Sequence, residues 1–327
     1  MTKFNKLKQF TLSGRESSLS VYKVRKKTVS LISSIARYVF LIAFSYTLLY
    51  PILFMISHAI RDPMFFNDPT VQWIPKAYTF SNFQSAWVVL QMPTSLFNTI
   101  TVEVISSLIS IIACGVAAYG LACFKFRGQG ILNALLILLI LVPFSMTLIP
   151  NFVNYYNFDF LGLFTLIEKI FKVEIDTNLL DTLWAVYLPS ITAVGLKSGL
   201  CIYIYRQFYR ALPKELFEAA WIDGAGPLLT YVRIVVPSSG VALLTVSLLS
   251  IIWHWNDYYI AQMFLTNHRT MAVELNDFFM HHGLDGVVVS ADSCMAACLM
   301  FVTPMLVFYL ILQKRFIASI SATGIVG

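Results

Sequence analysis

Charged residues are scarce in this sequence. Asp, Glu, Lys and Arg make up only 12% of its 327 residues, whereas about 25% is usual in soluble domains. Hydrophobic residues account for 58%, which is more than one water-soluble core of this size would bury. The composition excludes an ordinary soluble protein and favours one that lies in a membrane.

Motifs for metal or nucleotide chemistry are missing as well. The five cysteines form no Cys-x-x-Cys pair and no zinc-binding spacing with histidine, so we predict no metal site. No G-x-x-x-x-G-K-[ST] loop occurs, so the chain lacks this cradle for the phosphates of a nucleotide. The net charge of +6 could suggest nucleic-acid binding, but the basic residues lie beside the apolar runs, so we expect no nucleic-acid partner.

Six apolar runs are each long enough to cross about 30 Å of hydrocarbon as a helix. Backbone groups in lipid must bond within their own segment, and the runs lack the alternation of barrel strands, so we predict helices. The fold class is therefore all-α, with several membrane-spanning helices. The first run is too long for a signal-peptide core, so we expect it to be retained. The predicted spans cover residues 34–58, 96–122, 131–153, 183–209, 238–260 and 292–313.

The placement of basic residues sets the expected orientation, because loops rich in Lys and Arg tend to stay in the cytoplasm. Seventeen of the 23 Lys and Arg residues fall on the side that holds both termini and the loops after the second and fourth spans. We therefore expect both termini in the cytoplasm. Residues 1–33 form a basic cytoplasmic segment and residues 34–327 the membrane domain. We expect the part from Met1 to about Lys27 to be flexible and to contact anionic lipid.

The loop after the fourth predicted span contains a short amphipathic helix. Pro213 suits its first turn, and Glu215 and Glu218 suit the positive end of its dipole. Gly224 follows at a turn that we expect a side chain to crowd. Such a helix could lie on lipid headgroups or dock on a cytoplasmic partner. Four residues three or four apart form its apolar face, namely Leu216, Phe217, Ala220 and Trp221.

The same loop resembles a known signature. Glu218-Ala219-Ala220, then Gly224, then Ile234-Val235-Val236-Pro237 is similar to the EAA signature of permease subunits of bacterial ATP-binding-cassette (ABC) importers. The resemblance covers about residues 80–327, and within the family it is to carbohydrate permeases, in particular the smaller six-span membrane subunit of the maltose importer. The further matching motifs are Phe97-Asn98-Thr99, Ala117-Ala118-Tyr119, Trp255-Asn256-Asp257 and Gln313-Lys314-Arg315-Phe316.

That resemblance implies the transmembrane fold of type I ABC importers and no enzyme activity in this chain. The chain would form half of an alternating-access pathway for an oligosaccharide or related glycan, in the bacterial cytoplasmic membrane. The implied partners are a homologous permease subunit in a heterodimer, two cytoplasmic ATPase subunits, an extracellular solute-binding protein and membrane lipid. This chain would hold no cofactor, and ATP and Mg would bind the ATPase.

The expected coupling site lies in the EAA loop. The resemblance assigns contact with the ATPase to Glu218, Ala219, Ala220 and Gly224. The apolar face adds Leu216, Phe217 and Trp221, and Asp223 adjoins the glycine in the same segment.

Polar and aromatic residues at membrane depth are the second group of candidates, because ionisable groups are costly in lipid unless they face a cavity, snorkel or pair. Glu103 and Lys197 could make contacts within the bundle or line the solute path, and Asn98 could cap or bridge helices. Aromatic residues at the outer end of the fifth span could stack on sugar or form an interfacial belt. The candidate path residues are Asn98, Glu103, Lys197, Trp253, Trp255 and Asn256.

Other functions remain open from the residues alone. The chain could be an ABC permease for a non-sugar solute. It could also be an ion-coupled secondary transporter, although such proteins usually have structural repeats and helices broken at the midplane. A membrane receptor or scaffold is a third alternative. The outer insert near residues 164–182 leaves the cargo undetermined.

Overall fold

The computed structural model describes residues 2–65, 74–159, 162–172, 177–280 and 289–323. These ranges are mainly helical and contain no β-strand, so the all-α prediction is confirmed. The α-helices are α1 (Thr2–Ala59), α2 (Ser81–Val89), α3 (Met92–Thr99), α4 (Ile105–Cys123), α5 (Gln129–Leu141), α6 (Phe144–Tyr156), α7 (Leu163–Phe171), α8 (Trp184–Ile191), α9 (Ser198–Ala211), α10 (Lys214–Ile222), α11 (Pro227–Thr230), α12 (Val236–Ser238), α13 (Gly240–Trp255), α14 (Tyr259–Phe264), α15 (Met271–Asn276) and α16 (Ala291–Thr323). Short 3-10 segments cover Pro63–Phe65 and Phe278–Met280, and π-helical segments cover Ile100–Val104 and Tyr231–Val235.

Several helices could cross a membrane. In the described part of the chain, three are long and apolar enough, namely Lys26–Ala59, Met92–Cys123 and Ala291–Lys314. Two bent pairs could each form one more span, giving up to five. The pair α5 and α6 is bent by 103°, and the segment Pro227–Ser238 makes an angle of 84° with α13. The chain is therefore polytopic, while the predicted count of six stays a prediction.

Two of the predicted spans are broken by unusual backbone conformations. Val142 has an extended backbone because a residue before proline disfavours the helical region, and Pro143 then caps α6. The predicted span 183–209 is divided between α8 and α9. At this second break Ala193 and Lys197 have φ of 56° and 54°, in the left-handed region that non-glycine residues rarely adopt.

The centre of the bundle is the packing of α4 along α9, with α13 against both. Small residues let the helices approach: Gly115 on α4 leaves no room for a side chain, because a Cβ there would lie 2.6 Å from the Tyr231 hydroxyl. Tyr205 and Tyr209 on α9 are buried and stacked, with ring centroids 5.6 Å apart. This tyrosine-rich core supports the loop that contains α10.

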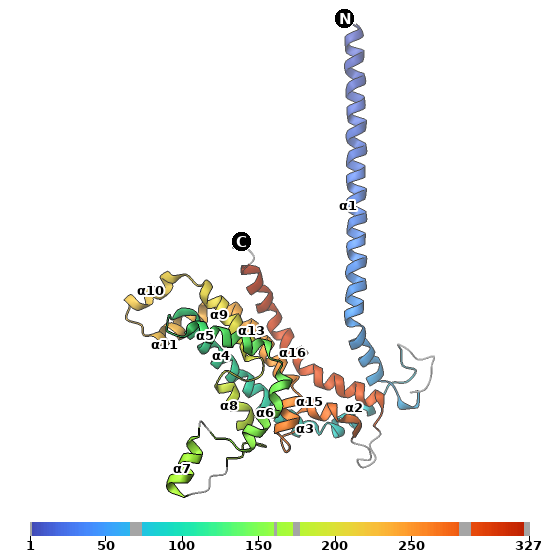
Figure 1. The fold of residues 1–327 in the computed structure, drawn as a ribbon. Coiled ribbons are helices and arrows are strands. Elements are labelled where there is room, and N and C mark those ends of the chain that lie inside the picture. Colours follow the sequence, from blue (N-terminus) through green and yellow to red (C-terminus); the bar gives the residue numbers. More distant parts are fainter. Residues whose placement is uncertain (1, 66–73, 160–161, 173–176, 281–288, 324–327) are drawn as a thin grey trace.

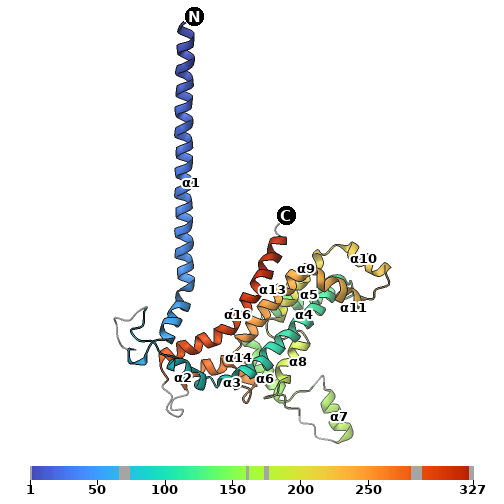
Figure 2. The same ribbon diagram turned by 180° about the vertical axis from the view of Figure 1, so that it is seen from behind.

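Helix α1 stands apart from the bundle over most of its length (Figures 1 and 2). Its 58 residues correspond to about 87 Å at 1.5 Å per residue. The segment up to about Lys27, which the sequence predicts to be flexible, is helical from Thr2 onward. The sequence before Pro51 contains no proline and only Gly14 as a glycine, so nothing local ends the helix.

A charged cluster fixes the end of α1 to the start of α16. Asp292 is buried and accepts hydrogen bonds from Nε of Arg61 at 2.9 Å and from an Nη of the same side chain at 2.6 Å. Nδ1 of His58 lies 3.0 Å from the same carboxylate. Asn82 of α2 donates to the backbone carbonyls of Ala59 and Arg61. These contacts bring α1, α2 and α16 together at one end of the protein.

The two ends of the bundle differ in what they present. The N-terminal end of α1, the C-terminal end of α16 and α10 all point to one side, and α7 lies at the opposite side (Figures 1 and 2). Helix α7 is held by Asp159, whose carboxylate accepts from Thr165 Oγ1 at 2.5 Å and from the Phe164 amide at 2.9 Å. The hydrogen bond from Thr165 has the largest effect on the pKa of Asp159, and together these bonds lower it.

Replacing Asp292 tests the cluster at the base of α1. Asp292→Asn removes the charge that faces Arg61 in a buried site, and breaking a buried pair typically costs about 3–5 kcal/mol. We expect a loss of about 3 kcal/mol in the free energy of unfolding in detergent, because Asn keeps one acceptor. Asp277→Asn is the matched control, since its pair with Arg269 is half-buried. Equal losses for the two variants would contradict the assignment.

Candidate functional site

Helix α10 begins after Pro213, which has an extended ψ of 135°, and ends at Ile222. Its predicted apolar face is divided in the structure. Phe217 and Ala220 are 9% and 4% exposed and pack inward, whereas Leu216 and Trp221 are 39% and 52% exposed. Glu218, Ala219, Asp223 and Gly224 are exposed as well. Two residues of the helix are therefore buried, whereas the other six predicted coupling residues are exposed.

Gly224 ends the helix in a left-handed turn with φ of 77°. The amide of Ala225 donates to the Ala220 carbonyl at 2.9 Å, and the amide of Gly224 donates to the Trp221 carbonyl at 3.1 Å. This pair of bonds is the Schellman arrangement, whose left-handed position favours glycine. The expectation of crowding is wrong for this chain, because an added Cβ would meet no atom within 4 Å. The backbone angle alone calls for glycine here.

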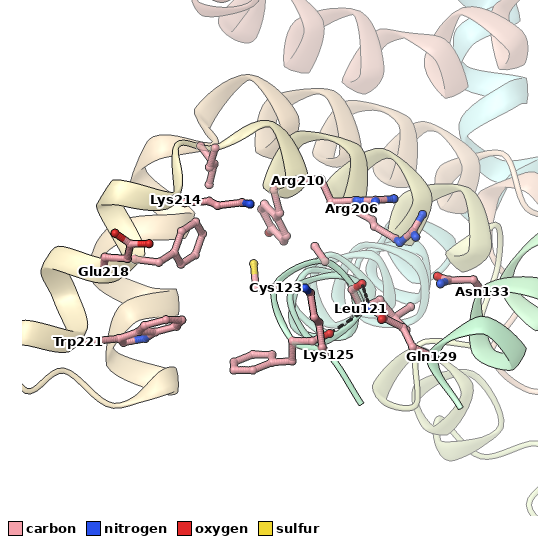
Figure 3. A pocket seen from close by; sticks show the side chains of 15 residues that line it. Leu121, Cys123, Lys125, Gln129, Asn133, Arg206, Arg210, Lys214, Glu218 and Trp221 are labelled. Atoms are coloured by element: carbon pink, nitrogen blue, oxygen red, sulfur yellow. Dashed lines mark hydrogen bonds between the residues drawn. The ribbon is translucent and has the colours of Figure 1, made fainter. Parts of the chain in front are cut away.

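A cavity of about 480 Å³ lies between α10 and the bundle (Figure 3). Its walls come from the end of α4, the start of α5, the end of α9 and α10. Gln129 closes part of it by donating to the carbonyls of Leu121 and Phe124, each at 3.0 Å. Glu218 and Trp221 line its far side on α10 (Figure 3).

Asn98 bridges two elements at the opposite end of the bundle. Its Nδ2 donates to the Arg269 carbonyl at 3.0 Å, and Thr99 Oγ1 accepts from the Met271 amide at 2.8 Å. Arg269 in turn donates to Glu274 and Asp277, both at 2.7 Å. Burial lowers the pKa of Arg269, but its bonds to Asp277 and Glu274 outweigh this and leave the pKa raised. Asn98 thus joins α3 to the segment that leads into α15.

Glu103 is 2% exposed and lies in the π-helical segment Ile100–Val104. Among the described atoms its Oε1 has no hydrogen-bond partner. Its charged neighbour is Asp257, whose Oδ2 accepts from the amides of Ile260 and Ala261 at the start of α14. No ion pair with Lys197 is found in the described part of the chain, so the two ionisable candidates are not partners.

Lys197 lies at the break between α8 and α9 and lines a cavity of about 320 Å³ with Thr147 and Asn151 of α6. The position is exposed and its backbone is left-handed. Residues with strained backbone cluster at functional sites, and this one lies next to a cavity with both polar and apolar lining residues. Lys197 is therefore the candidate path residue that the structure places beside open space.

The three candidates at the end of α13 have different surroundings. Trp255 is 5% exposed, packs on Phe301 and donates to the Phe301 carbonyl at 3.2 Å. Trp253 is half-buried, and Asn256 is exposed and donates to the Ile252 carbonyl at 2.7 Å. These residues are neighbours in sequence, but Trp253 and Trp255 pack in different clusters of the core.

A family model described as the binding-protein-dependent transport system inner membrane component matches residues 110–322. The chain belongs to this family. It is a membrane permease subunit of an ABC importer, and its family implies ATPase and binding-protein partners.

Individual relatives agree with this membership. The chain is 31% identical to the melibiose/raffinose/stachyose import permease protein MelC of Bacillus subtilis (strain 168) over 80% of this chain and 86% of the relative. It is 26% identical to the trehalose transport system permease protein SugB of Mycobacterium tuberculosis (strain CDC 1551 / Oshkosh) over 85% and 91%.

A solved structure has a similar fold. It is the crystal structure of a bacterial ABC transporter involved in the import of the acidic polysaccharide alginate, with a TM-score of 0.65 and 22% identity. The match covers 87% of this chain and 96% of that chain, and it shows the fold alone. The predicted ABC importer permease fold is confirmed.

Sequence reasoning missed the two charged clusters of this permease. Arg61 and Arg269 lie between the predicted spans, and Asp292 begins the last one. The one signal in the sequence was the position of these residues at the ends of apolar runs, where a charge can stay paired without entering lipid. Their partners could not be identified, because Arg61 and Asp292 are 231 residues apart.

Substitution of Gly224 tests the turn after α10. We expect Gly224→Val to abolish most ATP-driven uptake, because a β-branched residue is strongly disfavoured at positive φ. Gly224→Asn should keep more activity, since Asn tolerates this region. Gly226→Ala is the matched control, as Gly226 has φ of −70°. Uptake and ATPase co-purification should be measured together, and wild-type values for Gly224→Val would refute the role of the turn.

Proposed function

We propose that this permease imports an oligosaccharide or related glycan and is coupled to a separate ATPase through α10. The observation that carries the coupling is the division of α10, with Phe217 and Ala220 packed inward and Leu216, Glu218 and Trp221 exposed. A helix fixed to the bundle yet exposed on its outer face suits a docking element that transmits movement. ATP and Mg then bind the ATPase and not this chain.

The proposed cargo is supported by the names of the relatives. Several relatives are permeases for melibiose, raffinose and stachyose, for trehalose, or for arabinooligosaccharides. A second candidate is a smaller osmoprotective solute, because the osmoprotective compounds uptake permease protein GgtD of Synechocystis is 29% identical over 78% of this chain. Both candidates are polar solutes that need a wet path through the membrane.

The proposed assembly is a heterodimer of permease subunits with two ATPase subunits and an external binding protein. The most apolar stretch of α1 is not buried within the chain, which supports a second membrane subunit that packs on it. The partner or lipid would cover it. Residues 1–33 form the basic cytoplasmic segment of this arrangement and residues 34–327 the permease domain.

The proposed orientation puts both termini and α10 in the cytoplasm. The placement of basic residues and the common side of α1, α10 and α16 support it (Figure 1). A reporter that is active only outside the cytoplasm should be silent when fused near Gly130 or Gly226 and active near Asp176 or Asp285. The reverse pattern at any of these sites would exclude this orientation.

Uptake into vesicles tests the proposed function directly. Membranes that contain this chain with its ATPase and binding protein should accumulate labelled raffinose or trehalose only when ATP is supplied. Omission of this chain alone should abolish the uptake. Competition by unlabelled osmoprotective solutes would favour the second cargo. Uptake that needs an ion gradient and proceeds without ATP would contradict the ABC mechanism and favour a secondary transporter.

A further inference from the structure

The cavity beneath α10 is strongly basic (Figure 3). Four cationic side chains line it, and Glu218 is the one acidic residue among its lining residues. Lys125 comes from the segment between α4 and α5, and Lys214 from the first turn of α10. Arg206 and Arg210 lie one helical turn apart on α9, where like charges repel.

These charges are not neutralised within the described part of the chain. The ion pairs recorded there involve Asp292, Glu274 and Asp277, all far from this cavity in the fold. Arg206 is half-buried, and its Nε is buried with no hydrogen-bond partner among the described atoms. A buried unpaired donor is unfavourable, and more so when it is charged. An anion in the cavity would relieve both the repulsion and the unpaired donor.

An apolar groove adjoins the basic cavity. It has a volume of about 530 Å³ and is formed by α4, α5, the segment between α8 and α9, and α9. Leu121 lines both cavities, so the apolar groove is continuous with the basic cavity. Leu132, Leu135 and Leu139 of α5 form one wall and are all exposed at 40% or more. A charged site continuous with an apolar groove fits a molecule with an anionic head and a hydrocarbon tail.

We propose that the two cavities together bind one anionic phospholipid, with its phosphate between Arg206 and Arg210 and an acyl chain along α5. Basic pockets between membrane helices on the cytoplasmic side are a recognised mode of binding for such headgroups. The lipid would contact α9 and α10 at once and so brace the proposed coupling helix. The proposed orientation decides only which leaflet supplies the lipid. An acidic side chain of a partner protein would fill the basic cavity but leave the groove empty.

Lipid retention by the full chain tests this proposal. The chain is purified in detergent with the subunits that it retains, exposed to phosphatidylglycerol and phosphatidylcholine with the same acyl chains, and examined by native mass spectrometry. We expect retention of phosphatidylglycerol over phosphatidylcholine. The double variant Arg206→Gln/Arg210→Gln should retain roughly tenfold less phosphatidylglycerol than the wild-type chain, since each basic contact contributes to binding. Arg233→Gln is the matched control, because Arg233 is exposed and outside the lining.

A second variant separates a lipid from a free phosphate. A Cβ at Gly120 would meet no atom within 4 Å, so Gly120→Leu adds a side chain that narrows the groove without a clash at its Cβ. It should weaken retention of the diacyl lipid but not the binding of soluble glycerol phosphate at the arginines. Equal elution from a sizing column and equal thermal melting will establish that each variant is folded.

Three results would overturn the proposal. The first is equal retention of the two lipids by the wild-type chain. The second is a loss of lipid and glycerol phosphate in the arginine variant with no effect of Gly120→Leu, which would assign the cavity to a free phosphate. The third is unchanged lipid with reduced co-purification of the ATPase, which would assign the arginines to a protein interface. Because retention is measured in detergent without transport, its failure is distinguishable from failure of the proposed import function.

Discussion

The packing of Phe217 into the core cluster that contains Tyr205 and Tyr209 is the constraint on which the proposed coupling depends. A two-turn helix is not stable alone in water, so α10 exists because this burial holds it. Full burial of a phenylalanine contributes about 1.5–3 kcal/mol. The same contact ties α10 to the tyrosine-rich core beneath it, where Tyr205 and Tyr209 are buried.

The α4 and α9 pair extends from this core to the break at Lys197. Close packing along it makes the two helices a stiff unit, because protein interiors are dense and repack in discrete steps. At the far end of α9 lie the left-handed residues Ala193 and Lys197 and the cavity shared with Asn151. The exposed residues of α10 and the cavity beside Lys197 thus lie at opposite ends of the packed pair α4 and α9. This arrangement suits a permease whose pathway responds to a partner at one end.

The sequence predicted the elements whose causes are local. Helix α10 followed from its spacing, Pro213 and Gly224. The bend at Pro143 also has a local cause, in the conformational limits of proline and of the residue before it, but the prediction of one span over 131–153 missed it. It did not predict the left-handed Ala193 and Lys197, because tertiary packing imposes that backbone on residues that rarely adopt it. Nor could periodicity reveal which residues of α10 turn inward, or that Trp255 packs on Phe301, since both depend on elements distant in sequence.

Site-specific photo-crosslinking tests the central claim that exposed residues of α10 contact the ATPase. A photoreactive residue at position 221 should crosslink to the ATPase subunit, because Trp221 is exposed. The same residue at position 217 should crosslink only within this chain, because Phe217 is buried. An ATPase adduct from position 221 that changes in yield with ATP would support coupling through α10. Adducts with lipid alone, or equal ATPase adducts from both positions, would contradict it.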